Sequence, residues 1–184
     1  MPEQQDVVQL IMDDHREVER LFEALKTKRE DRPLLLPQLA SLLIAHSRAE
    51  EAEVYPAARD EAGETDEVAH SQEEHEEADA MLEELAGLEP DSAEFDAKLE
   101  ELTKAVLHHV EEEEEKVLPG MRERLSPERL DELARAFSES RTEHLGDRPG
   151  ELSREELQHK AQNQGITGTG SMSKSELKEA VKPD

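Results

Sequence analysis

Apolar residues recur along this chain at the spacing of α-helices. His15, Val18, Phe22 and Leu25 follow one another at steps of three, four and three residues, and the same steps recur over residues 75–85. Residues at this spacing lie on one face of a helix with about 3.6 residues per turn. Each of the two segments therefore predicts an amphipathic helix that carries one histidine in its apolar stripe.

A second pair of segments repeats at an offset of 63 residues. Leu39 and Leu43 correspond to Leu102 and Val106, and in each segment a histidine and a glutamate four residues apart continue the apolar face. A proline, which breaks or bends a helix, follows each glutamate. The chain thus predicts two similar helical hairpins and, from them, an all-α fold built as an up-down four-helix bundle. The repeated units are His46-Ser-Arg-Ala-Glu50 before Pro56 and His109-Val-Glu-Glu-Glu113 before Pro119.

Turn and capping residues mark the ends of the predicted helices. Asp31-Arg-Pro33 separates the first two helices, Gly63 closes the first hairpin, and residues 89–92 form the turn of the second. Ser126 and Pro127 suit the start of a fifth amphipathic helix, which we expect to cover the bundle. The four main helices are expected at about residues 4–28, 34–61 with continuation or a bend at Pro56, 66–88, and from 93 to Pro119-Gly120 or a few residues beyond.

The character of the chain changes after the predicted fifth helix. A stretch rich in glycine, proline and charge predicts a linker. Beyond it, Ser153 with Glu156 and Ser173 with Glu176 each form a capping box, so two short helices with an extended connection are expected. The predicted division is a helical bundle of residues 1–143, a linker of residues 144–150 and a module of residues 151–184.

Composition limits the classes of function. The 184 residues carry a formal net charge of −26 at pH 7, which repels phosphates and argues against nucleic-acid binding by the bundle, while it favours attraction of cations. Cysteine is absent, no secretory signal pattern is present, and the apolar stretch 34–45 is too short to span a bilayer. We therefore expect a cytoplasmic protein without membrane association.

The repeated polar residues have the donor chemistry of a transition-metal site. Neutral imidazole is a common ligand of such metals, and a carboxylate can bridge two ions. Four histidines and two glutamates fit a pair of iron or manganese ions better than magnesium or calcium, and they leave zinc or copper open. Six ligands shared by two ions would leave positions for dioxygen, peroxide or nitric oxide. The candidate ligands are His15, His46, Glu50, His75, His109 and Glu113.

Each of these residues also has an ordinary structural interpretation. A single histidine in a helix stripe is most often a hydrogen-bonded buried residue. Two glutamates buried without partners, however, would each cost about 2–7 kcal/mol, so a cation or another strong partner is needed. Glu51 and Glu114 could support the ligands from behind, and the other acids of residues 111–115 fit a solvated helix face. We assign His70, His108, His144 and His159 to surface or structural positions.

The order of these residues resembles that of the hemerythrin-like HHE cation-binding domains. The resemblance covers about residues 7–119 and includes Tyr55-Pro56 and Leu118-Pro119, which close the two motif helices. It implies a four-helix bundle with a non-haem di-iron centre. In such a centre the four histidines would be nitrogen ligands, and Glu50 and Glu113 would be carboxylate ligands that bridge the irons.

One departure from the family bears on function. Oxygen-carrying hemerythrins have two histidines one turn apart on the third helix, whereas the positions one turn from His75 are Ser71 and Asp79. Reversible oxygen carriage is therefore not implied, although Asp79 could supply an oxygen ligand. Tyr55 is expected to pack on the bundle as a helix-end aromatic residue, with a further ligand or a redox-active neighbour as the alternative.

Three short motifs stand out in the tail: Leu152-Ser-x-x-Glu-Leu157, Gly165-Ile166 and Met172-Ser-Lys-x-Glu-Leu177. Together they resemble the helix–extended–helix modules of the SAP and Rho N-terminal type, which are often linked to nucleic-acid binding. With five basic against six acidic residues and no aromatic platform, this module would attract nucleic acid weakly, although Lys174 could contact one phosphate. Docking to another protein suits it equally well.

Three functions are compatible with these features. The preferred one is a di-iron centre that handles dioxygen, peroxide or nitric oxide, as a catalase-like or peroxidase-like enzyme or as a redox stress protein. The second is an iron or gas sensor that signals to a partner through the tail, because metal bound only by the folded state stabilises that state. The third is an acidic helical adaptor without metal, which metal analysis would separate from the other two.

Overall fold

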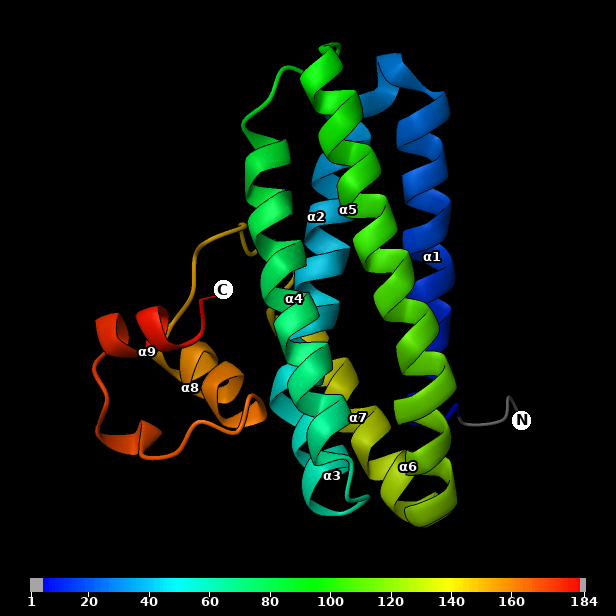
Figure 1. Ribbon diagram of the computed structural model, residues 1–184. Coiled ribbons are helices and arrows are strands. Elements are labelled where there is room, and N and C mark those ends of the chain that lie inside the picture. Colours follow the sequence, from blue (N-terminus) through cyan, green and yellow to red (C-terminus); the bar gives the residue numbers. More distant parts are fainter. Residues whose placement is uncertain (1–4, 183–184) are drawn as a thin grey trace.

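The computed structural model describes residues 5–182, and every regular element in this range is helical, which confirms the predicted all-α class. The predicted start of the first helix at Gln4 lies outside the described residues. Four long helices lie side by side, and successive ones run in opposite directions (Figure 1). Within residues 5–182, no helix has the length and apolar character that crossing a bilayer requires. The long helices are α1 (Val7–Thr27), α2 (Arg32–Ala49), α4 (Thr65–Ala86) and α5 (Ala93–Glu112).

Side-chain caps start several of these helices. Asp6 accepts a backbone N–H at the start of α1, and Ser92 does so at the start of α5. Ser126 caps α7 (Pro127–Glu143), as the sequence predicted. The first hairpin turns through a short 3₁₀ helix at Arg29–Asp31. These caps satisfy N–H groups that the first turn of a helix leaves without intrahelical partners.

Two π-helical turns interrupt the helices that carry the His-x-x-x-Glu units. The N–H of Tyr55 bonds to the carbonyl oxygen of Glu50, five residues back instead of four, and the N–H of Leu118 bonds to Glu113 in the same way. Residues five apart therefore lie above each other here. The sequence had predicted one helix that continues past or bends at Pro56, but the change in winding comes before this proline. The π turns are Glu50–Val54, followed by α3 (Tyr55–Asp60), and Glu113–Val117, followed by α6 (Leu118–Arg124).

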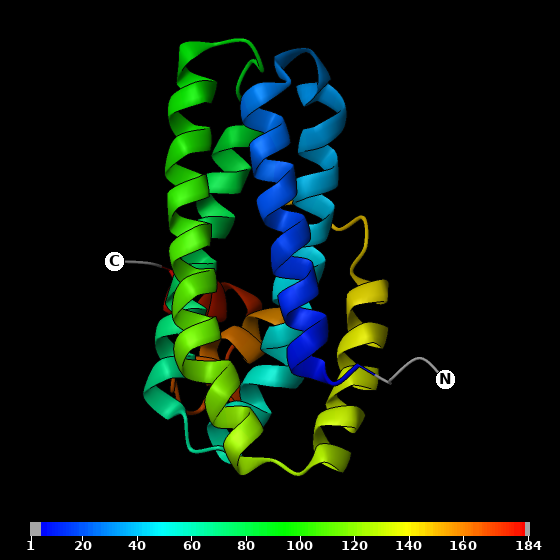
Figure 2. The same ribbon diagram turned by 90° about the vertical axis from the view of Figure 1, so that its right-hand side faces the viewer.

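The apolar core divides into two clusters with the candidate ligands between them. Along α1, Ile11 belongs to one cluster and Val18 to the other, and His15 lies between the two. The cluster that contains Ile11 also includes Phe137 of α7, which lies against α1 and α2 (Figure 2). α7 therefore covers one end of the bundle, as expected. The candidate ligands are therefore enclosed by apolar residues on both sides along the bundle axis.

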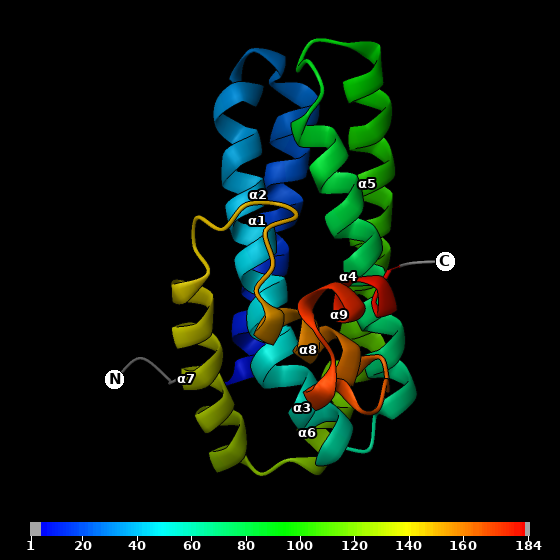
Figure 3. The same cartoon turned by 90° about the vertical axis from the view of Figure 1, so that its left-hand side faces the viewer.

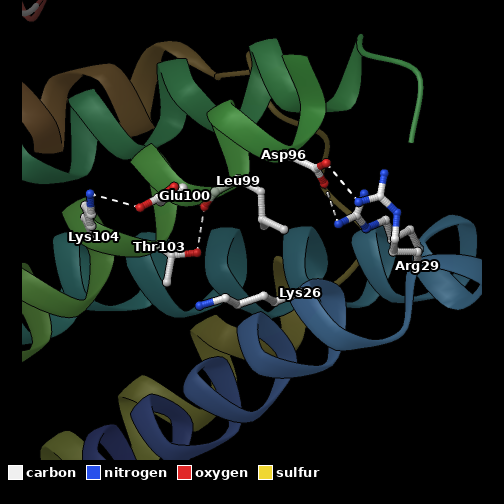
Figure 4. Close-up of a pocket in the computed structure, with 8 residues that line it drawn as sticks. Lys26, Arg29, Asp96, Leu99, Glu100, Thr103 and Lys104 are labelled. Carbon is white, nitrogen blue, oxygen red and sulfur yellow. Dashed lines mark hydrogen bonds and ion pairs between the residues drawn. The ribbon is translucent and has the colours of Figure 1, made fainter. Parts of the chain in front are cut away.

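One buried arginine ties the turns of the two hairpins together. Arg32 donates to the carbonyl oxygens of Leu25 (2.9 Å) and Pro90 (2.6 Å), and it pairs with Asp96 (2.8 Å). Arg29 binds the same Asp96 beside a pocket of about 430 Å³ between α1 and α5 (Figure 4). The hairpins are thus joined at their turns by charge as well as by apolar packing.

The C-terminal segment folds against the side of the bundle. Both predicted capping boxes form, at α8 (Arg154–Asn163) and α9 (Lys174–Ala180), and a 3₁₀ turn at Thr169–Ser171 lies between them. The two helices share a small apolar core that includes Leu157 and Leu177. α8 packs against α4 and the first π turn (Figure 3). The segment therefore has its own core and a contact with the bundle.

Candidate metal centre

The six residues predicted as ligands come together inside the bundle. They extend from the four long helices and the two π turns, and none has more than 7% of its surface exposed. Glu50 lies at the middle, because its Oε1 atom is 3.1 Å from His46 Nε2 and its Oε2 atom is 3.4 Å from His75 Nε2. The ligand atoms form two groups, each within 4.8 Å, that share Glu50. The groups are His15, His46 and Glu50, and Glu50, His75 and His109.

Several atoms that face this centre make no hydrogen bond. Glu113 Oε2 lies 3.2 Å from His109 Nε2 and 3.7 Å from His15 Nε2. Both Glu113 oxygens, Glu50 Oε1 and the Nε2 atoms of His15 and His46 lack a hydrogen-bond partner among residues 5–182. Buried polar atoms in this state cost several kcal/mol, on a scale of about 2–7 kcal/mol each. The donor set and its unpaired atoms therefore fit bound cations.

On the outer side, every imidazole is held by a carboxylate. Each of these carboxylates belongs to the residue next in sequence to a candidate ligand on a neighbouring helix. With Nδ1–H donating outward, Nε2 is the ring atom that faces the centre, where a bound cation would take the place of the proton that the carboxylates favour. The pairs are His46 with Asp14 (2.9 Å), His75 with Glu51 (3.0 Å), His109 with Glu74 (2.8 Å) and His15 with Glu114 (2.8 Å).

Half of these supporting carboxylates could be predicted from the sequence. Glu51 and Glu114 were expected behind the ligands, and they lie there. Asp14 and Glu74 were missed. The sequence does contain a signal for them. His15 and His75 occupy equivalent positions sixty residues apart, and an acidic residue directly precedes each of them.

The electrostatics of the centre are dominated by its carboxylates. Burial alone would lower the pKa of His46 and His109, because a charged ring is poorly solvated there. At His46, the charge of Glu50 and the hydrogen bond with Asp14 outweigh burial and raise the pKa to about 10. At His109, the hydrogen bond with Glu113 outweighs burial, and the pKa also rises to about 10. Burial would raise the pKa of Glu50, but His46 beside it holds that pKa well below its usual range. The negative groups thus favour positive charge at the centre.

Tyr55 packs in the apolar core, as expected, and its hydroxyl group also reaches the centre, as the alternative required. Its hydroxyl is 3.1 Å from His75 Nε2 and 3.5 Å from Glu50 Oε2, and the side chain is fully buried. The π turn is the physical reason, because it places Tyr55 above Glu50. The corresponding residue of the second half is Leu118. The first π turn therefore brings a phenol hydroxyl to the centre, whereas the second has an apolar side chain at the equivalent position.

Asp79 does not supply the oxygen ligand that its spacing from His75 suggested. Its Oδ2 atom is 2.7 Å from Arg48 Nη2 and 3.3 Å from Lys160 Nζ. These two cations hold the carboxylate in a separate buried charge cluster. Burial would raise the pKa of Asp79, but the charges of Lys160 and Arg48 lower it.

Lys160 of α8 connects the C-terminal segment to the centre. The side chain is fully buried, with Nζ 3.1 Å from Glu51 Oε1 and 2.7 Å from Glu76 Oε1. Burial alone would lower the pKa of Lys160, but the charge of Glu51 and its neighbours raises it. Asn163 adds a hydrogen bond of 2.9 Å to the backbone carbonyl oxygen of Glu51. Because Glu51 also holds His75, α8 lies directly behind one of the candidate ligands.

A small cavity adjoins the imidazole rings. Its volume is about 20 Å³, and Val18, Leu43 and Val106 line it together with the four histidines. A volume of roughly 10–15 Å³ on this measure holds one water molecule. The cavity thus suits a ligand of one or two heavy atoms.

These features define a helical protein with a buried cation-binding centre made of imidazoles and carboxylates. The hemerythrin HHE cation-binding domain matches residues 6–120, and the chain belongs to this family. The chain is also similar to a DNA nickase of Nostoc sp. (strain PCC 7120 / SAG 25.82 / UTEX 2576), with 29% identity over 140 residues. That match covers 75% of this chain but only 39% of the Nostoc protein. No solved structure matches the chain.

Proposed function

We propose that this protein holds a non-haem di-iron centre in a hemerythrin-like four-helix bundle and uses it to handle dioxygen, peroxide or nitric oxide in a redox or oxidative-stress role. The supporting observation is that the Nδ1 atoms of His15 and His46 are hydrogen-bonded, whereas their Nε2 atoms, which face the centre, have no hydrogen-bond partner among the described residues. Cations would remove the free-energy cost of those unpaired atoms. Imidazole and carboxylate suit iron and also admit manganese or zinc. The proposed ligands are His15, His46, Glu50, His75, His109 and Glu113.

The side chains around the irons would have distinct roles. Glu50, which is shared by the two groups of ligand atoms, is suited to bridge two ions. Bound iron would supply open positions at which a small oxidant or nitric oxide exchanges electrons. The Tyr55 hydroxyl can donate a hydrogen bond to a small ligand from one side. The cavity of about 20 Å³ excludes larger substrates.

Metal analysis of the purified full-length protein tests this proposal. We expect two irons per chain and an absorbance change on exposure to dioxygen or peroxide. His46→Ala and Glu113→Ala should lose both, whereas the control His159→Ala, a histidine outside the centre, should keep both. A stable, correctly folded protein that contains no metal and takes up no iron would overturn the proposal.

Catalase-like or peroxidase-like turnover in the cytoplasm is the enzymatic form of the proposal. Peroxide consumption by the iron-loaded protein, compared with His46→Ala, measures it. If iron binds but peroxide is not consumed, dioxygen or nitric oxide binding remains as the function of the centre, and spectra with each gas then distinguish the two ligands.

The contact between Lys160 and Glu51 favours a second candidate, an iron or gas sensor. Metal bound to His75 would order Glu51, and Glu51 holds the docked segment through Lys160. Deletion of residues 151–184 separates the two functions. With iron supplied at saturation, because the deletion also removes Lys160 from behind Glu51, an enzyme should retain its peroxide turnover, whereas a sensor should lose the binding of its partner.

A protein partner suits the C-terminal segment better than nucleic acid does. Lys160 is buried, and Arg154 donates to the carbonyl oxygens of Gly170 and Met172. Two of the five basic residues are therefore occupied within the chain, and the acidic bundle beside them repels phosphates. The name DNA nickase belongs to the longer Nostoc protein. The SAP-like or Rho-like character of the segment stays a prediction, and DNA binding by the purified protein at physiological salt would reverse this preference.

A further inference from the structure

The His-x-x-x-Glu spacing is also present at two places on the outer face of the bundle. His70 and Glu74 lie one turn apart on α4, and His108 and Glu112 lie one turn apart on α5. The Nε2 atom of His70 is 3.4 Å from Glu74 Oε1 and 2.9 Å from Glu112 Oε2. The Nε2 atom of His108 is 3.8 Å and 3.7 Å from the same two oxygens. Two imidazoles and two carboxylates thus lie near one another on this face, and His70, Glu74 and Glu112 are the three that lie closest together.

Four nitrogen–oxygen distances in this cluster lie near the spacing around a tetrahedral metal ion. Bonds of about 2.0–2.2 Å in a tetrahedral site place neighbouring ligand atoms about 3.3–3.6 Å apart. The four nitrogen–oxygen distances of this cluster, from 2.9 to 3.8 Å, lie on both sides of that value. An ion could therefore bind to His70, Glu74 and Glu112, whose ligand atoms lie within 4.8 Å of one another, and a rotation of the exposed His108 side chain would complete the site.

Each carboxylate is held by one oxygen and leaves the other free for the cluster. Glu74 Oε2 accepts the hydrogen bond from His109 Nδ1 at 2.8 Å, and Glu112 Oε1 accepts one from Lys116 Nζ at 2.5 Å. The oxygens that face the two histidines are Glu74 Oε1 and Glu112 Oε2. Because the other oxygen is fixed, little side-chain freedom remains to be lost when a ligand binds.

The cluster is open to solvent, unlike the buried centre. The side chains of His70 and His108 are 56% and 62% exposed. A hollow of about 300 Å³ adjoins it, and Asp66 and Glu67 line this hollow together with His70 and Glu112. These acidic neighbours raise the local concentration of cations.

We propose that His70, Glu74, His108 and Glu112 form a second, solvent-facing site for a divalent transition metal, with zinc as its natural probe. Two nitrogen and two oxygen donors suit such an ion, whereas calcium and magnesium prefer all-oxygen sites. Glu74 belongs to both sites, since it faces the outer cluster with one oxygen and His109 with the other. The outer site does not depend on which metal the buried centre holds.

Zinc binding to the full-length protein tests this site. The wild type is dialysed against Zn²⁺ beside the double variant His70→Ala/His108→Ala and the double variant Glu73→Gln/Glu111→Gln. The second is the matched control, because it removes two acidic charges from exposed positions of the same helices. We expect the wild type and the control to bind one more zinc per chain than the histidine variant.

Two results would overturn the proposal. Equal zinc content in all three proteins would mean that the histidines hold no ion, and an equal loss in the control would mean that the acidic surface attracts zinc without a defined site. The imidazole NMR signals of His70 and His108 should shift together as the additional zinc binds, and signals that stay unchanged while it binds would also exclude this site. The iron content of the histidine variant should equal that of the wild type, which separates this test from that of the buried centre.

Discussion

Asp14 illustrates how a residue outside the proposed ligand set can affect the affinity for a metal by holding one of the candidate ligands. It holds the Nδ1 atom of His46 at 2.9 Å and is itself paired with Arg141. We expect Asp14→Asn to weaken iron binding by about 10–100-fold, the usual effect of altering the partner behind a metal-ligating histidine. Competition with a chelator measures this affinity. Asp13→Asn makes the same charge change at an exposed position of α1, and an equal effect of both variants would contradict the specific role of Asp14.

Glu64 should make stability depend on pH at a position away from the centre. Its carboxyl group lies against Gly120, and burial, with a smaller contribution from Glu67, raises its pKa from 4.5 to about 7 against the opposing charge of Arg124. Since the unfolded chain loses this proton at lower pH than the folded protein, the free energy of unfolding falls as pH rises from 4.5 to about 7.

We therefore expect Glu64→Gln to be more stable than the wild type above pH 7 and equally stable below pH 4.5. Urea unfolding at both pH values, with a chelator present, measures the difference. Glu73→Gln, which changes an exposed glutamate of α4, the helix that Glu64 directly precedes, should show no such pH-dependent difference in stability. If Glu64→Gln and the wild type differed in free energy of unfolding by the same amount at both pH values, protonation of Glu64 would not be the cause.

The sequence predicted the six candidate ligands because a histidine or glutamate in an apolar stripe is recognisable by itself. It could not assign the roles of Asp14 and Glu74 in the same way. A residue next to a ligand is turned by about 100° around its own helix, so the helical pattern assigns it to a solvent-exposed face. Its partner is a histidine of another helix, so the contact exists only once the helices have packed.

At the scale of the helices, the apolar period predicted the long elements to within a few residues. It missed both π turns, because a periodic pattern is interpreted with one fixed number of residues per turn. The wider turn changes which side chains share a face, and it brings the Tyr55 hydroxyl to the candidate metal centre. Hydrogen bonding of the backbone, which the apolar pattern does not specify, sets this change.

The junction of the two hairpins depends on Arg32. Arg32→Ala would leave the carbonyl oxygens of Leu25 and Pro90 without a donor, and we expect it to reduce the free energy of unfolding by about 3 kcal/mol. Arg29→Ala removes an exposed partner of the same Asp96 and should cost about 1 kcal/mol or less. Urea unfolding compares the two variants. Equal losses would mean that the charge on Asp96, and not the buried backbone bonds, dominates the junction.

At the scale of the whole molecule, the docking of the C-terminal segment was the least predictable feature. Its capping boxes fixed its two helices, but nothing in its composition indicates which basic residue is buried. Lys160 can be buried only because Glu51, Glu76 and Asp79 reach it from the bundle. Complementarity between segments so far apart in the chain does not appear in the periodicity of either one.

Lys160→Met removes this cation and keeps a long apolar side chain. Glu51, Glu76 and Asp79 would then be buried around Arg48 alone, and breaking a buried ion pair in this way costs about 3–5 kcal/mol. Release of α8 avoids that cost, because water then reaches the carboxylates. We therefore expect α8 to lose its protection from hydrogen exchange and residues 144–150 to become sensitive to protease.

The same variant should weaken iron binding, because Glu51 would lose one of the groups that position it behind His75. Lys178→Met removes the same charge from an exposed position of α9 and should change neither the protection of α8 nor the affinity for iron. If Lys160→Met leaves both at their wild-type values, the segment is held by its remaining contacts, which include the hydrogen bonds of Asn163 to Glu51 and of Arg59 to Gln162. Docking and metal binding would then be independent, and a sensor that works through α8 would have no physical basis.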